Sequence, residues 1–519
     1  MKPEAGGSVA GHKAITIRMY RKGLGDCLLL GIPGSKRTFW MLVDCGLILG
    51  TPDAVTKIAE IVADVATVTD NHLDVLVVTH EHWDHVSGFV QAKQAFQALT
   101  IDALWMAWTE DPKDKLATRL RREREEKLKK LVGFVANLGA RGLAAESVAT
   151  GISSVLSFFN FGFGAVGGST RDALANARGF VNGKEPIYWR PDDPPLTPPQ
   201  APCVRIFALG PPHDEKAIKK TFAKSEVYHV GAVESAVLAA DQSAIGAGTP
   251  WDAFSPFDRD VGVALRPLVD APRFASGSED PDPLRNFLER HYLDPDPAVD
   301  EEGQDWRRID NAWLGPAADF ALALDSATNN TSLVLAIEII ESGKVILLPG
   351  DAQVGSWLSW QECVWQVAGR PVTGPELLGR TVFYKVGHHG SHNATLREKG
   401  LELMTSPELV AFIPVNREVA RQKGWEEMPF LGLVQALNER TQGRVLQADR
   451  NYVLNATAAS RAFAAELKQT PLFLNTRYRF SSEGRVGTAA WGIARALGPG
   501  TKMTHGARCV KSSVHTERD

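Results

Sequence analysis

The chain has 519 residues, of which 44% are hydrophobic and 23% charged, and its formal net charge is −4. This is ordinary globular composition, and the length suits two to four domain-sized units or one core with large insertions. The charge excludes a global basic field for nonspecific nucleic-acid binding but leaves a local basic groove open. The five cysteines are too far apart for a CxxC site, and their low, odd number favours a reducing compartment over a disulfide scaffold.

The chain opens on a strand-rich block. Short apolar segments divided by glycine turns predict strands, and the segment 53–68 has the spacing of an amphipathic helix. The run LDVLVV is almost continuously apolar, which is typical of a strand buried on both faces. The strands predicted in this block lie at 15–18, 27–31, 40–43 and 73–78.

The middle of the chain has less pattern. A helix is predicted at 116–138, and its charges of mixed sign indicate a solvated face. The uncharged segment 151–168 is short for a membrane span and contains several glycines, so we expect it to be buried. A proline-rich connector at 186–202 indicates a boundary, a strand is expected at 203–209, and the acidic stretch 276–310 indicates a surface insertion.

Strand patterns return in the second half of the chain. They predict strands at 332–340, 344–348, 382–386, 409–415 and 444–447. The N-terminal segment lacks the apolar region of a secretory signal. With neither a signal nor a convincing span, we expect a cytoplasmic protein without a membrane span.

The stretch VVTHEHWDH places four metal-binding side chains directly after the strand predicted at 73–78. His80 and His82 are two residues apart, so in an extended loop both imidazoles point the same way and can hold one metal ion. Asp84 and His85 follow the turn and can face a second ion about 3.5–4 Å away. Because four ligand side chains in six residues exceed what one ion needs, this loop predicts a two-metal centre rather than a histidine-rich surface loop.

Two strand ends in the second half supply further ligand types. ILLPGDA places Asp351 behind a strand and a glycine, where its carboxylate can bridge two ions, although a Gly-Asp pair there is also a common turn. YKVGHHGSHNAT brings His388, His389 and His392 together after the next predicted strand. Six of the 13 histidines fall in these two histidine clusters, which favours one shared site.

Together, HxHxDH, a strand-terminal GD and HHGS resemble the motif series of the metallo-β-lactamase-fold hydrolases. The set GLGDCLLL, FWMLVDCG, THEHWDHVSGF, IFALGPP, NNTSLVL, LLPGDA and KVGHHGS is most similar to the soluble metallohydrolase domain of ComEC-like competence DNA-uptake proteins. The resemblance implies an α/β fold, the αββα metallo-β-lactamase sandwich, with a large, mostly helical or irregular insertion and a C-terminal extension. The membrane-helix runs of the transport proteins are absent, so translocation is not implied.

The resemblance also divides the chain into core, insertions and extension. The expected parts are the first half of the core at 13–108, a helical insertion with a proline-rich end at 109–200, a core strand at 201–215, an acidic, loop-rich insertion at 216–327, the second half of the core at 328–450 and the extension at 451–519.

The same resemblance implies a ligand set. His80 and His82 would bind the first metal ion, and Asp84 and His85 the second. Asp351 would bridge the two ions. The last ligand is expected to be His388, because it follows the strand directly. His389 would then lie behind the ligands or donate a proton, and Asp44 would support the metal loop from behind.

Other positions have weaker motifs. The first metal site of the family usually has a third histidine after a middle strand, and here His213 follows LGPP. It is either that ligand or an exposed loop residue, and the sequence leaves both open. Ser391, Asn393 and Lys385 are expected to contact substrate.

The expected cofactors are two divalent metal ions, with Zn²⁺ the default for such ligands and Mn²⁺ or iron suited to the same set. Two ions lower the pKa of a bridging water and supply hydroxide, whose proton Asp84 can orient or accept while it binds metal. His389 would protonate the leaving group. Three function classes follow: a phosphodiesterase or nuclease, as the resemblance implies; a hydrolase of a small ester, lactone or amide under a roof formed by the insertion; and a non-catalytic metal-binding module.

Overall fold

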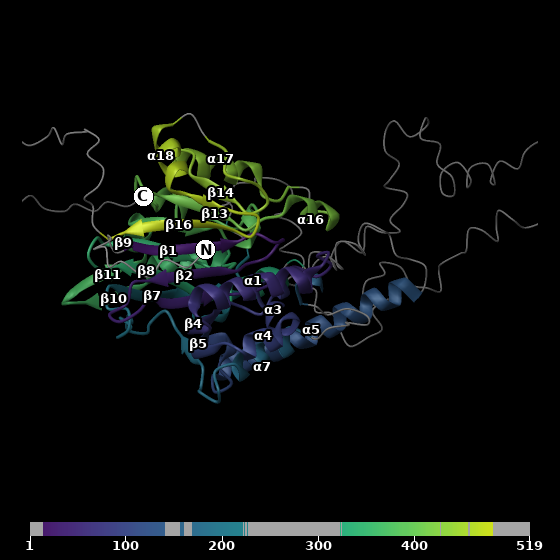
Figure 1. Cartoon of the computed structure of the whole chain (residues 1–519). Coiled ribbons are helices and arrows are strands. Elements are labelled where there is room, and N and C mark those ends of the chain that lie inside the picture. The colour runs from purple at the N-terminus through teal and green to yellow at the C-terminus, as the bar shows by residue number, and fades with distance from the viewer. Residues whose placement is uncertain are drawn as a thin grey trace, which may run out of the picture. The chain divides into compact units, whose positions relative to one another are not determined.

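Two β-sheets bury their apolar faces against each other (Figure 1). The first sheet has the order β15-β16-β1-β2-β3-β4-β5-β6, and the second has the order β14-β13-β12-β9-β8-β7. Their central strands come from the apolar runs predicted above, since a strand covered on both faces must be apolar along its length.

The strands of the first sheet are β1 (Ala14–Tyr20), β2 (Leu28–Ile32), β3 (Phe39–Val43), β4 (His72–Val78), β5 (Thr100–Ala107), β6 (Ile187–Trp189), β15 (Lys468–Gln469) and β16 (Phe473–Arg479). Those of the second sheet are β7 (Val204–Gly210), β8 (Val334–Ile339), β9 (Lys344–Leu348), β12 (Thr381–Lys385), β13 (Val410–Ile413) and β14 (Val445–Gln447). A separate hairpin consists of β10 (Val364–Val367) and β11 (Arg370–Thr373).

Helices cover the outer face of each sheet, which completes the expected αββα sandwich. The first sheet packs on α1 (Ala54–Thr69), α3 (Gly88–Gln91), α4 (Lys93–Gln97) and α7 (Thr170–Gly179), which Figure 1 shows beside β4 and β5. The second sheet packs on α14 (Val354–Ser359), α15 (Gly374–Gly379) and α17 (Leu431–Arg440). In the described part of the chain, further helices include α2 (Trp83–Val86), α5 (Lys115–Ala140), α8 (Glu215–Ile218), α16 (Arg417–Gln422) and α18 (Ala458–Glu466), with short 3₁₀ turns such as η1 (Trp108–Glu110), η6 (Trp360–Glu362), η7 (His388–Gly390) and η8 (Leu401–Leu403).

The computed structural model describes residues 14–140, 156–159, 169–221, 223, 226, 322, 324–425, 427–454 and 457–480, with side chains of the first range described to 132. Most of the predicted acidic insertion at 216–327, and of the apolar segment 151–168, lies outside the described residues. No helix in the described part of the chain is long and apolar enough to cross a membrane.

Two strands that pair directly with predicted core strands come from segments that the sequence placed outside the core. β16 pairs antiparallel with the whole of β1, so residues after 450 add to the first sheet. β6 lies in the proline-rich connector and pairs with β5. Both are edge or near-edge pairings between distant segments, which depend on the partner strand rather than on a local apolar run.

The strand ends that carry the candidate ligands meet at one edge. β3, β4 and β5 run parallel, as do β9, β12 and β13, so the carboxyl ends within each set point the same way. The backbone N–H of Leu333 donates to the carbonyl of Thr79 at 2.8 Å and links the two sheets at this edge. The loops after β4, β9 and β12 therefore converge.

Candidate metal centre

The loop after β4 is held from behind by Asp44. Asp44 follows β3 in a left-handed backbone conformation with φ 54°. Its carboxylate accepts from the backbone N–H of Thr79 at 2.8 Å and from the Thr79 hydroxyl at 2.6 Å. It also lies 2.8 Å from Nδ1 of His85, so Nδ1 carries a ring proton and Nε2 is the nitrogen that faces the site. The supporting role that the resemblance implied for Asp44 fits this geometry.

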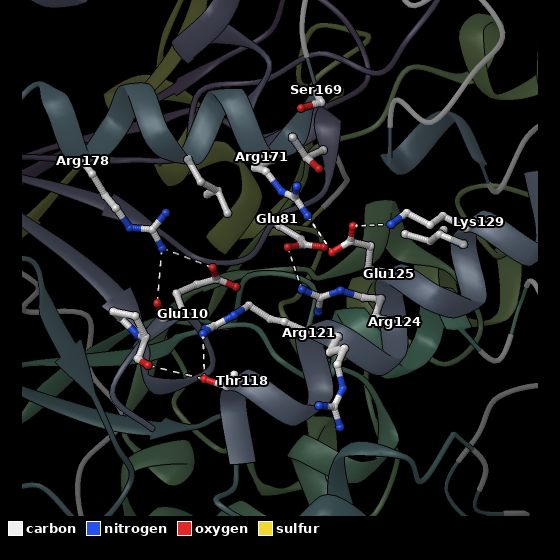
Figure 2. A pocket seen from close by; sticks show the side chains of 15 residues that line it. Glu81, Glu110, Thr118, Arg121, Arg124, Glu125, Lys129, Ser169, Arg171 and Arg178 are labelled. Carbon is white, nitrogen blue, oxygen red and sulfur yellow. Dashed lines mark hydrogen bonds and ion pairs between the residues drawn. The ribbon is translucent and has the colours of Figure 1, made fainter. Parts of the chain in front are cut away.

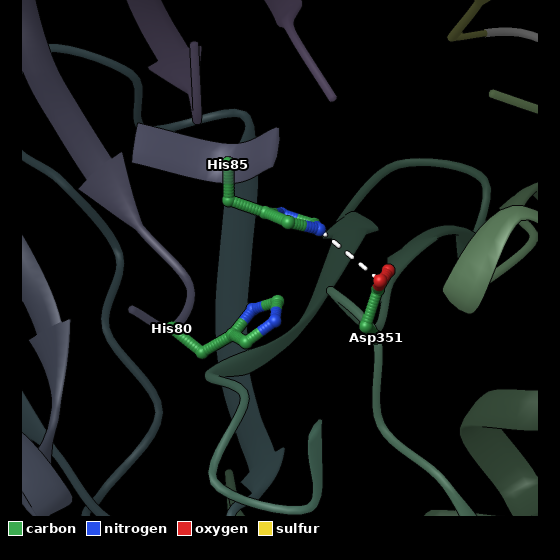
Figure 3. A group of neighbouring side chains, drawn as sticks. All are labelled: His80, His85 and Asp351. Atoms are coloured by element: carbon green, nitrogen blue, oxygen red, sulfur yellow. Dashed lines mark ion pairs between the residues drawn. The ribbon is translucent and has the colours of Figure 1, made fainter. Parts of the chain in front are cut away.

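Asp351 reaches the same place from β9. Its Oδ2 lies 3.1 Å from Nε2 of His85, and Figure 3 shows both side chains pointing toward each other beside His80. Side-chain atoms of His80, His85 and Asp351 all lie within 4.8 Å of one another. The turn that presents Asp351 needs Gly350, whose φ is 56° and where an added Cβ would lie 2.9 Å from Cβ of Ser332.

Lys385 neutralises the carboxylates behind the centre. Its ammonium is buried, donates to Oδ1 of Asp351 at 2.8 Å and to the carbonyl of Gly350 at 2.7 Å, and forms an ion pair with Asp26. Burial alone would lower the pKa of Lys385, but Asp26 and Asp351 raise it above its usual value. The expected contact of Lys385 with substrate does not fit this placement, because all of its charge is directed at protein oxygens. The second carboxylate partner of Lys385 is Asp26, which lies in the motif GLGDCLLL.

His389 lies against Asp84. Its Nε2 is 2.7 Å from Oδ2 of Asp84, while its Nδ1 donates to the carbonyl of Pro414 at 2.7 Å. Asp84, Asp351 and His389 form a second group of side chains whose ligand atoms lie within 4.8 Å of one another. Although burial opposes it, the hydrogen bond to Asp84 raises the pKa of His389. The residue adopts φ 51°, a conformation that is uncommon for histidine and typical of functional turns.

His388 is held at its Nδ1 edge by neighbouring polar side chains and makes no hydrogen bond with Asp84. Its Nδ1 lies 2.7 Å from the Ser391 hydroxyl and 3.0 Å from Nε2 of Gln353. The Gln353 amide donates to Nδ1, so Nε2 carries the ring proton. Asn393 donates to Oε1 of Gln353 at 2.9 Å and so belongs to the same network. Burial lowers the pKa of His388 to about 4, so the ring is neutral near pH 7.

The buried polar atoms of this region fit metal ions. Transfer of a polar atom from water to a buried position without a partner costs free energy, so each such atom needs a ligand. Several atoms here are fully buried with no hydrogen-bond partner among the described residues, namely Nε2 of His80, both ring nitrogens of His82, Oδ1 of Asp84, Nε2 of His85, Oδ1 of Asp325 and Oδ2 of Asp351. Nitrogen and carboxylate oxygen donors in this number suit two divalent transition-metal ions.

Asp325 was not singled out from the sequence. It is 4% exposed, and its Oδ1 lies 3.7 Å from Nε2 of His82. Burial, together with the nearby charges of Asp84 and Asp351, raises the pKa of Asp325 well above its usual value. No spacing in the sequence marks Asp325, because it precedes NNTSLVL in a segment without a strand pattern.

The structure does not bring His213 to this centre. Its Nε2 lies 2.9 Å from Oδ2 of Asp114, its ring centroid lies 4.3 Å from that of Trp108, and its side chain is 43% exposed. It is in none of the four groups of ligand-type side chains found among the described residues. Its placement is that of the loop residue that the sequence kept as an alternative.

Phenylalanines from the segment 156–159 roof the centre. The ring of His82 has its centroid 5.3 Å from that of Phe158 and 4.8 Å from that of Phe159. Phe158 stacks on Trp425 at 5.0 Å with an interplanar angle of 4°. Phe158 and Phe159 are both buried, and so are His80, His82, Asp84 and His85 beneath them. The described side chains that contact the ring of His82 from this side are therefore aromatic.

The residue between the first two histidines is tied to α5. Glu81 forms an ion pair with Arg124 at 2.6 Å, and the two line a pocket of about 960 Å³ with further arginines (Figure 2). Burial raises the pKa of Glu81 to about 7, while Arg124 opposes that shift. The helix that follows the first half of the core is thus coupled to the backbone of the metal loop.

A comparison with known protein families gives a match in the first half of the core. The model of the Metallo-beta-lactamase superfamily matches residues 21–144, so this part of the chain carries a domain of that superfamily. The match contains the whole metal loop and ends before β9 and β12. No curated protein and no solved structure gives a significant match to the chain. The two-sheet fold and the buried His/Asp groups agree with this match, which covers less than half of the chain.

Proposed function

We propose that this protein is a dinuclear metal-dependent hydrolase that cleaves phosphodiester bonds. The observation that carries the proposal is the convergence, at one sheet edge, of buried nitrogen and oxygen atoms that have no hydrogen-bond partner among the described residues. Such atoms are stabilised by cations, and two adjacent cations stabilise the charge that develops in phosphoryl transfer. The phosphodiester class rests on the resemblance to ComEC-like domains.

The contacts support an assignment of ligands to two halves of the centre. His80 and His82 belong to the first half. Asp84, His85 and His389 belong to the second, because His389 faces Asp84 and both share a group with the bridging Asp351. His389 thus replaces His388 as the proposed last ligand. A left-handed backbone at both histidines turns the second ring, rather than the first, toward Asp84.

When bound, the two ions supply a hydroxide nucleophile near neutral pH. The chain orients that nucleophile through Oδ1 of Asp84, which faces the centre with no hydrogen-bond partner among the described residues. Asp44 and the carbonyl of Pro414 fix the tautomers of His85 and His389. Lys385 keeps Asp351 ionised by holding its Oδ1.

His388 is proposed to donate a hydrogen bond from Nε2–H to a substrate oxygen on which negative charge develops, because its ring is neutral near pH 7. Its Nε2–H faces the centre, and its ring is 12% exposed, in contrast to the fully buried His389. Ser391 and Gln353 hold Nδ1 and set the ring orientation. Ser391 and Asn393, expected to bind substrate, therefore act in this proposal by positioning His388.

The roof over His82 favours a second candidate, hydrolysis of a small ester, lactone or amide. Phe158 and Phe159 cover the first half of the centre with apolar surface, which suits a small substrate better than a duplex nucleic acid. Lys385, which was expected to contact substrate, is instead buried against carboxylates.

One experiment separates these functions. Purified protein is loaded with Zn²⁺ or Mn²⁺, its metal content is measured, and bis(p-nitrophenyl) phosphate, single-stranded DNA, p-nitrophenyl acetate and a simple lactone are assayed with and without chelator. We expect close to two ions per chain and chelator-sensitive cleavage of the phosphodiester, lost in Asp84→Asn. Preferential cleavage of the acetate or lactone supports the second candidate. Two bound ions with no turnover of any substrate indicate a non-catalytic module, and no bound metal contradicts the whole proposal.

A further inference from the structure

We propose that Asp325 is a metal ligand and completes the half of the centre that contains His80 and His82. This inference rests on the proposed dinuclear centre and adds a carboxylate where the resemblance leads one to expect a histidine. Asp325 comes from the segment before β8, on the opposite sheet from the metal loop.

The distances around Asp325 suit a shared cation better than a direct contact. Oδ1 of Asp325 lies 3.7 Å from Nε2 of His82, beyond the usual range of a hydrogen bond. Two ligand atoms held about 2.0–2.2 Å from one ion at a tetrahedral angle are about 3.3–3.6 Å apart, so a slightly wider angle gives the observed separation. Both atoms lack a hydrogen-bond partner among the described residues, and both side chains are at least 95% buried.

The other oxygen of Asp325 is already positioned. Its Oδ2 accepts from Nδ2 of Asn329 at 3.0 Å and lies 3.6 Å from Nε2 of His388. One oxygen is therefore anchored while the other points at His82, which is the arrangement of a monodentate carboxylate ligand with an outer hydrogen bond. Asn329 is buried, so the anchor is protected from water.

A carboxylate in this position changes the preference of the half-site for metals. Replacing an imidazole nitrogen by a carboxylate oxygen adds a negative charge and a harder donor, which favours Mn²⁺ relative to Zn²⁺. We therefore expect this half-site to discriminate less strongly between Zn²⁺ and Mn²⁺ than a half-site with three histidines.

Metal binding, rather than turnover, tests the proposal. The wild type, Asp325→Asn, Asp325→His and the control His213→Ala are titrated with Zn²⁺ and with Mn²⁺ by calorimetry, metal content is measured after dialysis, and Co²⁺-loaded samples are compared by visible absorption. Circular dichroism checks that each variant is folded.

In Asp325→Asn, we expect one ion to remain tight and the affinity for the other to fall at least about 10-fold, because an amide oxygen replaces an anionic ligand. Asp325→His should bind two ions with a raised preference for Zn²⁺ over Mn²⁺, and His213→Ala should match the wild type. If Asp325→Asn does not fold, the preference of Asp325→His for Zn²⁺ over Mn²⁺ tests the assignment of Asp325 as a ligand.

Unchanged affinities and Co²⁺ spectrum in both Asp325 variants, or loss of an ion in His213→Ala, overturn the assignment while leaving a dinuclear hydrolase intact. A wild type that binds no ion overturns both the assignment and the proposed function. A wild type that binds two ions but cleaves nothing affects the proposed function alone.

Discussion

Nε2 of His389 lies 2.7 Å from Oδ2 of Asp84, although the two residues are 305 positions apart in the chain. The contact joins the turn after β12 to the metal loop after β4, and so connects the two sheets through the candidate metal centre. The neighbouring His388 makes no such contact with the metal loop, and its ring is held by Ser391 and Gln353. The two adjacent histidines therefore have different expected roles.

The first prediction separates His389 from His388. His389→Ala should lose the ion of the second half-site, because it removes a ligand donor facing Asp84. His388→Ala should keep both ions and lose about 10²–10³-fold in kcat, the usual cost of removing one hydrogen-bond donor to a developing negative charge. The loss should be smallest for nitrophenolate leaving groups, on which the charge is already delocalised. Metal analysis and steady-state kinetics provide the measurements. Loss of metal in His388→Ala alone would reverse the two roles.

The second prediction concerns the buried cation Lys385. In Lys385→Met, two buried carboxylates, Asp26 and Asp351, lose their counter-charge, so the metal-free protein should lose about 3–5 kcal/mol of unfolding free energy. Urea denaturation in the presence of chelator measures this. The matched control is Lys344→Met, whose partially exposed pair with Glu408 should contribute no more than about 1 kcal/mol. Equal effects of the two changes would contradict the charge-compensating role of Lys385.

The third prediction links metal binding to pH. Burial disfavours a charged His85, but Asp351 and the surrounding carboxylates outweigh it and raise its pKa well above the usual value; the pKa of His389 is also raised. In the metal-free protein both rings therefore retain protons to a higher pH than a free imidazole does, and they must lose protons to bind metal. Apparent metal affinity should rise with pH through and above about 6.5, with protons released on binding.

Calorimetry in buffers with different ionisation enthalpies counts those protons. The sign follows from the direction of the pKa shift: because the free form holds the protons, raising the pH removes a competitor of the metal. A proton release near zero at pH 6.5, or an affinity that does not change between pH 6 and pH 8, would show that the rings are already neutral.

The fourth prediction concerns Glu81 and Arg124. The pKa of Glu81 is raised to about 7, so the folded protein binds a proton at Glu81 more tightly than the unfolded chain does. The resulting stabilisation is fully present below the unfolded pKa of about 4.5 and is lost as the pH rises through 7. Arg124→Met removes the partner that limits this shift, so its destabilisation should be larger at pH 8 than at pH 5. A double-mutant cycle with Glu81→Gln should give a coupling of about 0.5–3 kcal/mol at pH 8.

Thermal and urea unfolding at the two pH values measure the effect. Arg122→Met is a suitable control, because Arg122 is 71% exposed and its pair with Glu126 spans 4.0 Å. Equal changes in unfolding free energy for Arg124→Met and Arg122→Met at both pH values would contradict a stabilising role of the Glu81–Arg124 pair.

The fifth prediction concerns the aromatic roof. Phe158→Ala removes the ring that lies between His82 and Trp425, so it should open the space above the first half-site. The ratio of kcat/KM for a bulky nitrophenyl substrate to that for a small one should rise about 10-fold, the size of effect that pocket shape commonly has on selectivity. An unchanged ratio with an intact metal content would mean that substrate approaches the centre from another side.

The sequence determined the parts of this protein that depend on neighbouring residues. The run LDVLVV predicted β4 because an uninterrupted apolar strand must be covered on both sides, and the predicted strand at 73–78 nearly coincides with His72–Val78. The His80–His85 loop was predicted as a metal site because its spacing alone brings the ligand types together. The αββα arrangement was implied by the resemblance to the metallo-β-lactamase fold and is confirmed by the two sheets and their helical layers.

Only the tertiary structure decided which side chains face the centre from a distance. His388 and His389 are equivalent as residue types, and the left-handed backbone of the turn determined which ring reaches Asp84. No sequence pattern distinguishes Asp325 from other aspartates, and only the packing of the two sheets places it opposite His82. Lys385 was expected at the substrate and instead is buried between two carboxylates. Local spacing fixes the direction of a side chain only relative to its own strand or turn. Its partner across the sandwich is set by how the sheets pack.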